Sequence, residues 1–176
     1  HLPRLLPRCR PIAEVVPIQQ TLPGCPPTPE LFVKLLFHPK DLRIAKTVCR
    51  ECGRKKHKEM RPRHLAGVLH GSVLPDICLI NQGYLFIGIS TRGGCHAPCT
   101  NAGQPCVGCR GPSDAFIHKE PESWLNAIWK IFSKMTDVPQ DEIETALRSP
   151  QLSLFLFQFS HDALTGAYPD QNVEVL

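Results

Sequence analysis

The chain has 176 residues, a formal net charge of +4 and 42% hydrophobic residues, which excludes a disordered protein and indicates about one domain. No apolar run is long enough to span a membrane, and we expect a cytoplasmic protein. Because the sequence begins with His1 rather than Met, we expect the true N-terminus to lie elsewhere. The nine cysteines include closely spaced pairs, which favour metal or redox ligands over the disulfides of a small secreted scaffold.

Much of the chain is expected to be ordered loop, because eighteen prolines, about twice the usual share, end helices and remove backbone donors. The apolar stretch 15–18 predicts a strand. Thr28, followed by a proline, predicts the start of an amphipathic helix over 30–38. The basic stretch 39–77 is expected to be loop-like with one helical turn, and the apolar stretch 76–88 to begin helically.

The second half combines an irregular segment with helices. Glycine, proline and cysteine dominate 88–113 and predict an irregular loop. Leu125, Ile128, Trp129 and Phe132 recur at helical spacing, which predicts a helix over 121–134. A further helix is predicted over 137–149, and 153–159 is apolar and β-prone. Trp124 and Trp129 are expected in the core or at a subunit interface.

Four cysteines stand within fifteen residues in the irregular loop. Cys95, Cys99, Cys106 and Cys109 supply enough thiolates for one iron–sulfur cluster, and the glycines and prolines between them let the backbone approach the sulfurs. A structural zinc ion also takes four thiolates at about this density. The spacing alone leaves both interpretations open.

A second CxxC pair, Cys49 and Cys52, stands upstream, with Cys78 as the next cysteine along the chain. These three thiols predict a second site. A zinc ribbon would instead pair Cys49 and Cys52 with the last two cysteines of the dense loop, but that separation is longer than usual and leaves the other two unused. The basic run 54–58 lacks the aromatic residues that stack on bases, so we interpret it as a solvated loop or a docking face for an acidic electron partner rather than a nucleic-acid patch.

Three blocks of sequence resemble the small, electron-transferring subunit of [NiFe]-hydrogenases, in the archaeal-type branch of F420-non-reducing hydrogenases and sulfhydrogenases. They are GCPPTPE at 24–30, VCRECGRKK at 48–56 and CLINQGYLFIGISTRGGCHAPCTNAGQPCVGCRGP at 78–112, and the resemblance covers roughly 12–112. It implies that this chain itself forms and breaks no covalent bonds. The chain would relay electrons between the nickel–iron centre of a large subunit and a flavoprotein, ferredoxin-like or heterodisulfide-reductase-type subunit.

The resemblance also implies a row of clusters. Cys25 would bind the cluster nearest the nickel–iron centre, with its other ligands from a flavodoxin-like domain that this sequence lacks; Cys9 is interpreted as an ordinary cysteine. The four cysteines of the dense loop would bind a middle [4Fe-4S] cluster. Cys49, Cys52 and Cys78 would bind an outer cluster whose fourth ligand position is occupied by Phe86.

A phenyl ring cannot ligate iron, so the outer cluster is expected to be a [3Fe-4S] form, to have an open corner, or to take a substitute ligand. Asp76, His70 and His64 are candidates by chemistry, although each is expected to be an ordinary loop residue. Loss of an iron or of a thiolate ligand is expected to raise the reduction potential.

The expected fold is helical plus an irregular iron–sulfur domain, rich in loops, with a short α/β remnant of the flavodoxin-like domain at the N-terminus. The expected division is a remnant over 1–38, a cluster-binding domain over 39–113 and a helical segment over 114–176. Two other functions stay open: a cluster subunit of a complex I-like oxidoreductase, and a zinc-bound nucleic-acid or scaffold module.

Overall fold

The computed structural model describes residues 12, 15–39, 44, 46–67, 72–115 and 121–147, with the backbone alone for 121–125. In these residues, irregular loops connect short helices, and β pairing is confined to isolated bridges. The described part thus has no β-sheet to organise it. The helices, in chain order, are α1 (Pro29–Phe37), α2 (Val48–Glu51), the 3-10 turn η2 (Ile80–Gln82), α3 (Pro98–Asn101), α4 (Pro121–Met135) and α5 (Gln140–Leu147).

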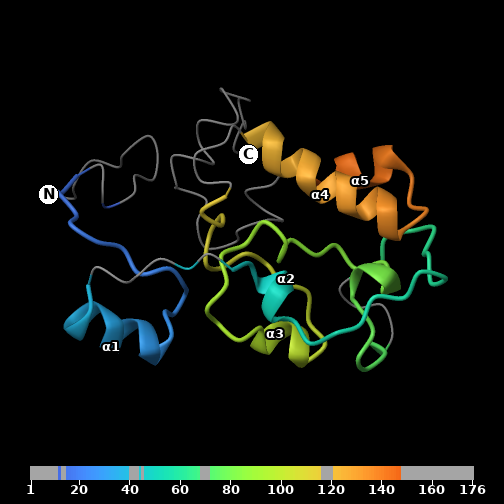
Figure 1. Cartoon of the computed structure of the whole chain (residues 1–176). Coiled ribbons are helices and arrows are strands. Elements are labelled where there is room, and N and C mark those ends of the chain that lie inside the picture. Colours follow the sequence, from blue (N-terminus) through green and yellow to red (C-terminus); the bar gives the residue numbers. More distant parts are fainter. Residues whose placement is uncertain are drawn as a thin grey trace, which may run out of the picture.

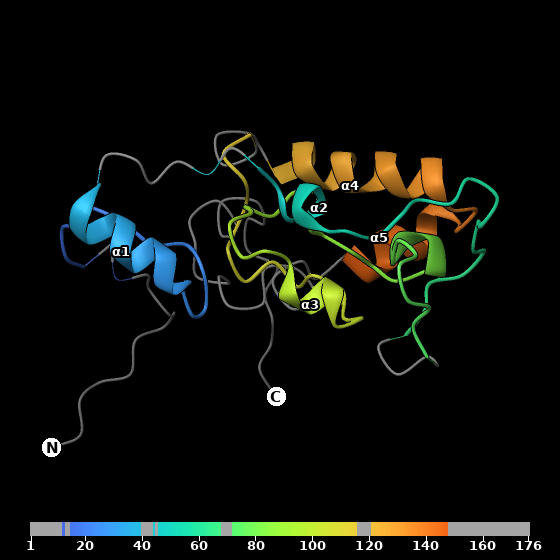
Figure 2. The ribbon, with the colours of Figure 1, turned by 60° about the horizontal axis from the view of Figure 1, so that its bottom comes forward.

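Helix α1 lies to one side of the molecule, at the opposite end from α4 and α5 (Figures 1 and 2). Pro29 occupies its first turn, as the sequence predicts, and the extended backbone of Thr28 precedes it. Leu31 is buried, whereas Phe32 and Leu36 are 50% and 74% exposed. The predicted helix over 30–38 is therefore confirmed to within a residue at each end, although most of its apolar side chains are left in solvent.

The strand predicted over 15–18 is wrong. The structure places no strand at these residues, and Val15 and Val16 are 67% and 49% exposed. Pro17 has no N–H for a ladder bond, and none of the other described segments pairs with this stretch. Apolar, β-branched residues alone do not make a strand when no partner edge is available.

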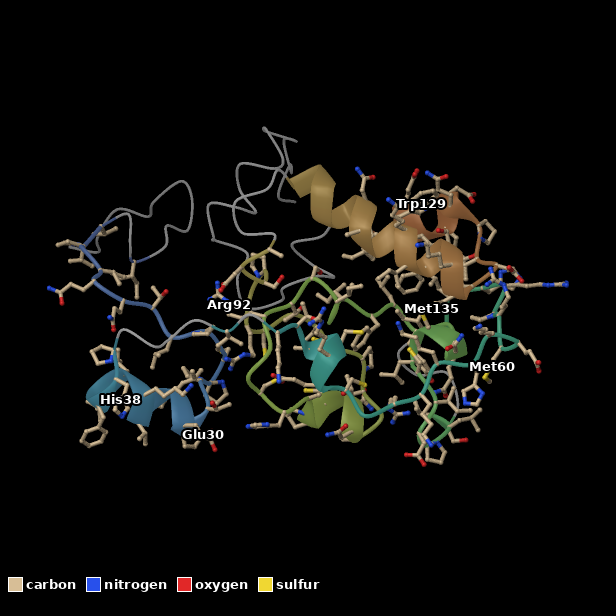
Figure 3. The ribbon with its side chains drawn as sticks, in the orientation of Figure 1. Glu30, His38, Met60, Arg92, Trp129 and Met135 are labelled. Carbon is tan, nitrogen blue, oxygen red and sulfur yellow. The ribbon has the colours of Figure 1, made fainter. Side chains whose placement is uncertain are left out.

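Helices α4 and α5 form the core together with the segment that follows Cys78. Ile128 and Phe132 on α4 are fully buried, which confirms the predicted apolar face, and Trp129 packs partly buried beside them. Figure 3 shows Trp129 and Met135 on this helix. The second predicted helix exists as Gln140–Leu147; it begins three residues later than expected, and 148–149 lie outside the described residues. The remaining members of the core cluster are Leu79, Ile80, Tyr84, Phe86, Ile87, Val138, Ile143 and Leu147.

Polar side chains tie the loops to the end of α4. The amide of Asn81, 2% exposed, donates to the carbonyls of His57 and Met60 and accepts from the N–H of His57. Arg61 donates to the carbonyls of Lys134 and Thr136, which satisfies carbonyls at the C-terminal end of α4. The basic segment thus serves partly as an anchor for the helical pair.

Isolated bridges and single helical turns hold the cysteine-bearing loops. The predicted helical turn in the basic segment is confirmed as α2, and the dense loop contains one turn that was not expected, α3. Bridges join Thr47 to Arg92 and Thr91 to Pro112, so the CxxC segment lies beside both ends of the dense loop. In the described part of the chain, no helix is both long and apolar enough to cross a membrane. Cys9, Trp124, Leu125 and 153–159 lie outside the residues or side chains described.

Candidate metal centre

Cys49, Cys52 and Cys78 meet at one small hollow and are called the Cys49 group below. Cys49 lies on α2, and its N–H donates to the carbonyl of Gly88 at 2.9 Å. Cys78 is brought beside α2 because its N–H donates to the carbonyl of Lys55 at 2.7 Å. The hollow has a volume of about 30 Å³. It is lined by the three cysteines with Arg54, Lys56, Leu79 and Phe86.

Phe86 therefore forms a wall of the same hollow as the three thiols. Its ring is 3% exposed and belongs to the core that α4 and α5 complete. None of the polar candidates for a substitute ligand lines this hollow among the described residues. Asp76 is exposed, His64 is 83% exposed and lies 3.4 Å from a carboxylate oxygen of Glu142, and His70 is outside the described residues.

The Cys49 group combines partly buried thiols with two cations, Arg54 and Lys56. Burial raises the pKa of the Cys49 thiol, Lys56 opposes that rise, and the neighbouring thiols of Cys78 and Cys52 add to it. Arg54 donates to the carbonyls of Thr100, Leu74 and Ile77 at 2.7–3.0 Å, which fixes its guanidinium between this hollow and the dense loop. Two cations at the rim would offset the negative charge of deprotonated thiols.

Cys95, Cys106 and Cys109 lie close enough for their charges to interact and are called the Cys95 group. Burial raises the pKa of Cys106 to about 12, and the thiols of Cys109 and Cys95 add to that rise. Burial also raises the pKa of Cys95. Such thiols lose their protons when a metal binds, so metal binding to this group would release protons.

Backbone N–H groups point at two sulfurs of the Cys95 group in the same local geometry. The N–H of Ala97 bonds the Cys95 sulfur and the N–H of Gly108 bonds the Cys106 sulfur, in each case two residues along the chain. Both donors have positive φ, 52° at Ala97 and 76° at Gly108, so each sulfur faces a backbone turn of left-handed conformation. Donors of this kind stabilise thiolates and tune the potential of a bound centre.

Glu51 connects the two groups of thiols, a role that the sequence did not indicate. It lies on α2 between Cys49 and Cys52, and its carboxylate accepts from the N–H groups of Gly94 and His96 at 2.5 and 3.0 Å. These N–H groups flank Cys95. The one sequence signal that could have pointed to it is a lone carboxylate inside a basic CxxC segment.

The structure does not bring all predicted ligands together. Cys99 is exposed on α3, and Cys25 is exposed in the turn before α1. Within the described residues, no three His, Cys, Asp or Glu side chains converge closely enough to hold a single metal ion. A cluster needs less convergence, because each thiolate binds a different iron atom. The thiols, their N–H donors and the nearby cations fit an iron–sulfur group.

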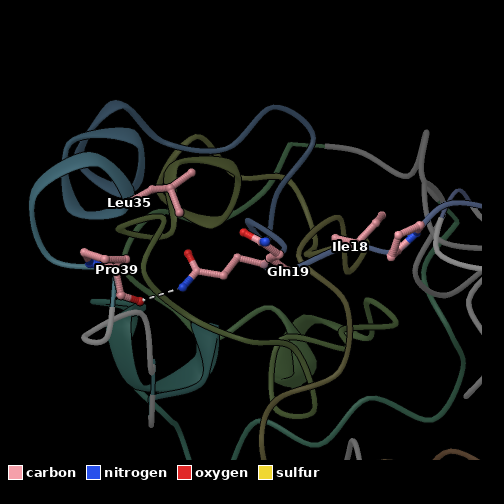
Figure 4. Close-up of a pocket in the computed structure, with 6 residues that line it drawn as sticks. Ile18, Gln19, Leu35 and Pro39 are labelled. Carbon is pink, nitrogen blue, oxygen red and sulfur yellow. Dashed lines mark hydrogen bonds between the residues drawn. The ribbon is translucent and has the colours of Figure 1, made fainter.

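A larger, open hollow lies beside α1 (Figure 4). It has a volume of about 730 Å³, and Gln20 donates across it to the carbonyl of Pro39 at 3.1 Å. Among the described residues, no thiol, carboxylate or imidazole lines it, so it offers no chemistry comparable to that of the thiol groups. Its lining consists of Pro17, Ile18, Gln19, Gln20, Leu35 and Pro39.

Comparison with known proteins supplies an independent observation. The chain is 38% identical over 118 residues to a subunit of the F420-non-reducing hydrogenase vhu of Methanocaldococcus jannaschii, covering 65% of this chain and 41% of that protein. It is 31% identical over 173 residues to the iron-sulfur subunit of the F420-non-reducing hydrogenase of Archaeoglobus profundus, covering 90% of this chain and 52% of that protein. The chain is related to archaeal hydrogenase subunits.

A further relative is the sulfhydrogenase 2 subunit delta of Pyrococcus furiosus, 31% identical over 108 residues, covering 59% of this chain and 38% of that protein. The chain thus spans about half the length of the curated relatives it matches, or less. No family model matches it. These relatives support the hydrogenase resemblance that the cysteine motifs indicate.

Proposed function

We propose that this chain is the cluster-binding part of an electron-transferring hydrogenase subunit. The observation that carries the proposal is the gathering of thiols into two groups, each supplied with cations or N–H donors that stabilise thiolates. One relative is named an iron-sulfur subunit, which agrees with this chemistry. The chain itself would carry electrons, and the oxidation of H2 or reduction of protons would occur in a nickel–iron large subunit.

The Cys95 group, joined by Cys99, would supply four thiolates to a [4Fe-4S] cluster. This requires α3 to bring the exposed Cys99 toward the other three sulfurs. Clusters of this kind supply one-electron chemistry when bound. The chain's own contribution is to hold the thiolates, direct the N–H groups of Ala97 and Gly108 at the sulfurs, and limit access of water.

The Cys49 group would supply three thiolates to a second cluster, and Phe86 would close its fourth side. Since no carboxylate or imidazole lines the hollow among the described residues, a three-iron cluster or one with an open corner suits these side chains better than a substituted four-iron cluster. The apolar ring would also exclude water from that side. Cys25 would contribute to a third cluster whose other ligands come from outside this chain.

The contacts suggest the order of the relay. Gly24, beside Cys25, lies against the side chain of Arg110 in the dense loop, and Glu51 joins the dense loop to α2. Electrons would pass from the Cys25 turn through the Cys95 group to the Cys49 group. The acceptor beyond would be a flavoprotein, a ferredoxin-like subunit or a heterodisulfide-reductase-type subunit.

Metal and sulfide analysis of the anaerobically purified native complex tests this proposal, with electron paramagnetic resonance on the same samples. Iron and sulfide for several clusters are expected, with the signal of an oxidised three-iron centre. Iron and sulfide for four-iron clusters alone would mean that the corner at Phe86 is open or is filled by another ligand. Zinc without sulfide would refute the relay and leave a structural metal module.

A further inference from the structure

Arg110 directly follows Cys109, and its side chain is only 2% exposed. Burial of a guanidinium is unfavourable unless charge and hydrogen bonds compensate it. Its Nε donates to the carbonyl of Gly93 at 2.7 Å, but its Nη2 has no hydrogen-bond partner among the described residues. Arg110 is therefore a buried cation with a donor still to be satisfied.

Two glycines make the slot that holds this guanidinium. A β-carbon at Gly24 would lie 3.1 Å from Nη1 of Arg110, and one at Gly94 would lie 3.1 Å from Nη2. Both glycines have positive φ, 128° and 88°, which side chains rarely adopt. The slot thus joins the turn that carries Cys25 to the loop that carries Cys95.

The charged groups facing Arg110 are the thiols of Cys95 and Cys109, the carboxylate of Glu51, and Arg92. Glu51 is already engaged by the N–H groups of Gly94 and His96, and Arg92 lies 3.0 Å from a carboxylate oxygen of Asp114. Deprotonation of Cys95 and Cys109 would give Arg110 the negative partners that its burial requires.

We propose that Arg110 is a positioning residue that raises the reduction potential of the centre at the Cys95 group and fixes that centre beside the Cys25 turn. The inference rests on the proposed relay. Adding one electron makes the site more negative by one charge, with no bond formed or broken. A fixed cation in a site that excludes water favours that reduced state.

The test measures the midpoint potential of this centre in the purified complex, by redox titration followed by electron paramagnetic resonance. In Arg110→Met we expect the ratio of reduced to oxidised centre at a fixed potential to fall at least tenfold, a shift of about 59 mV for a one-electron couple. Arg110→Gln retains an amide donor for Gly93 and is expected to shift the potential in the same direction. Arg110→Lys retains the charge and should stay within about threefold of the wild-type ratio.

Arg63→Met is the matched control, because it removes the same charge from an exposed side chain. It should leave the ratio unchanged, since exposed charges are screened. If the Arg110→Met complex fails to assemble, the midpoint potential of the Arg110→Gln complex tests the proposal. Two results would overturn the role of Arg110 while leaving the relay intact. One is a wild-type midpoint potential in an Arg110→Met or Arg110→Gln complex that assembles. The other is a shift of the potential in Arg110→Lys as large as that in Arg110→Gln. A wild-type complex without iron and sulfide would instead refute the relay itself.

Discussion

The ring of Phe86 lies directly against the backbone of Gly88. A β-carbon at Gly88 would come within 2.4 Å of the ring's Cζ and 2.8 Å of its Cε1, so the ring occupies the space that a side chain would need. The carbonyl of Gly88 in turn accepts the N–H of Cys49. The backbone of Gly88 thus holds both the ring of Phe86 and the N–H of Cys49 in place.

Gly88→Ala is expected to destabilise the protein by about 1–3 kcal/mol, because the added methyl group must displace a fully enclosed ring. Chemical denaturation of the wild type and variant measures this change. Gly53→Ala is the control, since nothing lies within 4 Å of its added carbon. Combining Gly88→Ala with Phe86→Leu should recover part of the loss, and strictly additive effects would show that the two residues are not in contact.

Phe86→Cys is expected to supply a fourth thiolate to the Cys49 group. If the proposed three-iron centre is present, the variant should gain one iron per chain and lose the signal of the oxidised three-iron form. Phe86→Ala is the matched control, because it removes the same ring without adding a thiol and should keep that signal. An unchanged spectrum and potential in Phe86→Cys would mean that position 86 is not the missing ligand site.

Glu51→Gln is expected to weaken the loop around Cys95 by about 1–3 kcal/mol, because charge-assisted bonds to two N–H groups are replaced by an amide that can accept at only one atom. Hydrogen exchange at Gly94 and His96 should speed up correspondingly. Glu59→Gln, at an exposed position of the basic segment, provides the control. Unaltered exchange at both amides would contradict the bridging role of Glu51.

In the chain without metal, Cys106 is expected to react with iodoacetamide far more slowly than the exposed Cys99 at pH 8. Burial raises the pKa of Cys106 to about 12, so its thiolate fraction should grow about tenfold per pH unit up to that value. Because the folded state favours the protonated thiol, this group's contribution to stability is complete below the ordinary thiol pKa of about 8.5 and is lost as pH rises toward 12. Mass spectrometry of the alkylated chain at several pH values provides the measurement, and equal rates at pH 8 would refute it.

Phe132→Ala is expected to cost about 3–5 kcal/mol, because Phe132 is fully buried where α4 packs on the segment after Cys78. Lys130→Ala, on the exposed side of the same helix, should have little effect. The free energy of unfolding, measured by chemical denaturation, distinguishes the two variants. A loss below about 1 kcal/mol would show that α4 does not support the cysteine-bearing loops.

Local signals predicted the helices well and the contacts between distant segments poorly. Pro29 and the spacing of Ile128 and Phe132 were enough to locate α1 and α4, because a helix is specified by residues a few positions apart. The strand expected over 15–18 failed because a strand needs a partner that local sequence cannot provide. The fold class expected from the resemblance stays a prediction, since loops and helices alone do not identify it.

In the candidate site, too, local sequence predicted some features and missed the contacts between distant segments. Cysteine spacing and the resemblance predicted the membership of the Cys49 group and the presence of Phe86 beside it, and the structure places all four at one hollow. The ligand roles themselves stay predictions. Glu51 was missed because the amides it binds lie more than forty positions away in the chain. Arg110 was missed because burial and an unused donor become visible only in three dimensions.

In the described loops, the polar side chains of Glu51, Arg54 and Asn81 hold segments together, as the backbone hydrogen bonds of a β-sheet do in other proteins. Each reaches backbone groups in segments far away in the chain. A sheet shares such bonds among many residues, so that one substitution removes only a small part of them. Here the order of whole loops depends on single side chains. Substitutions at these few polar positions are therefore expected to be tolerated as rarely in evolution as substitutions in the apolar core.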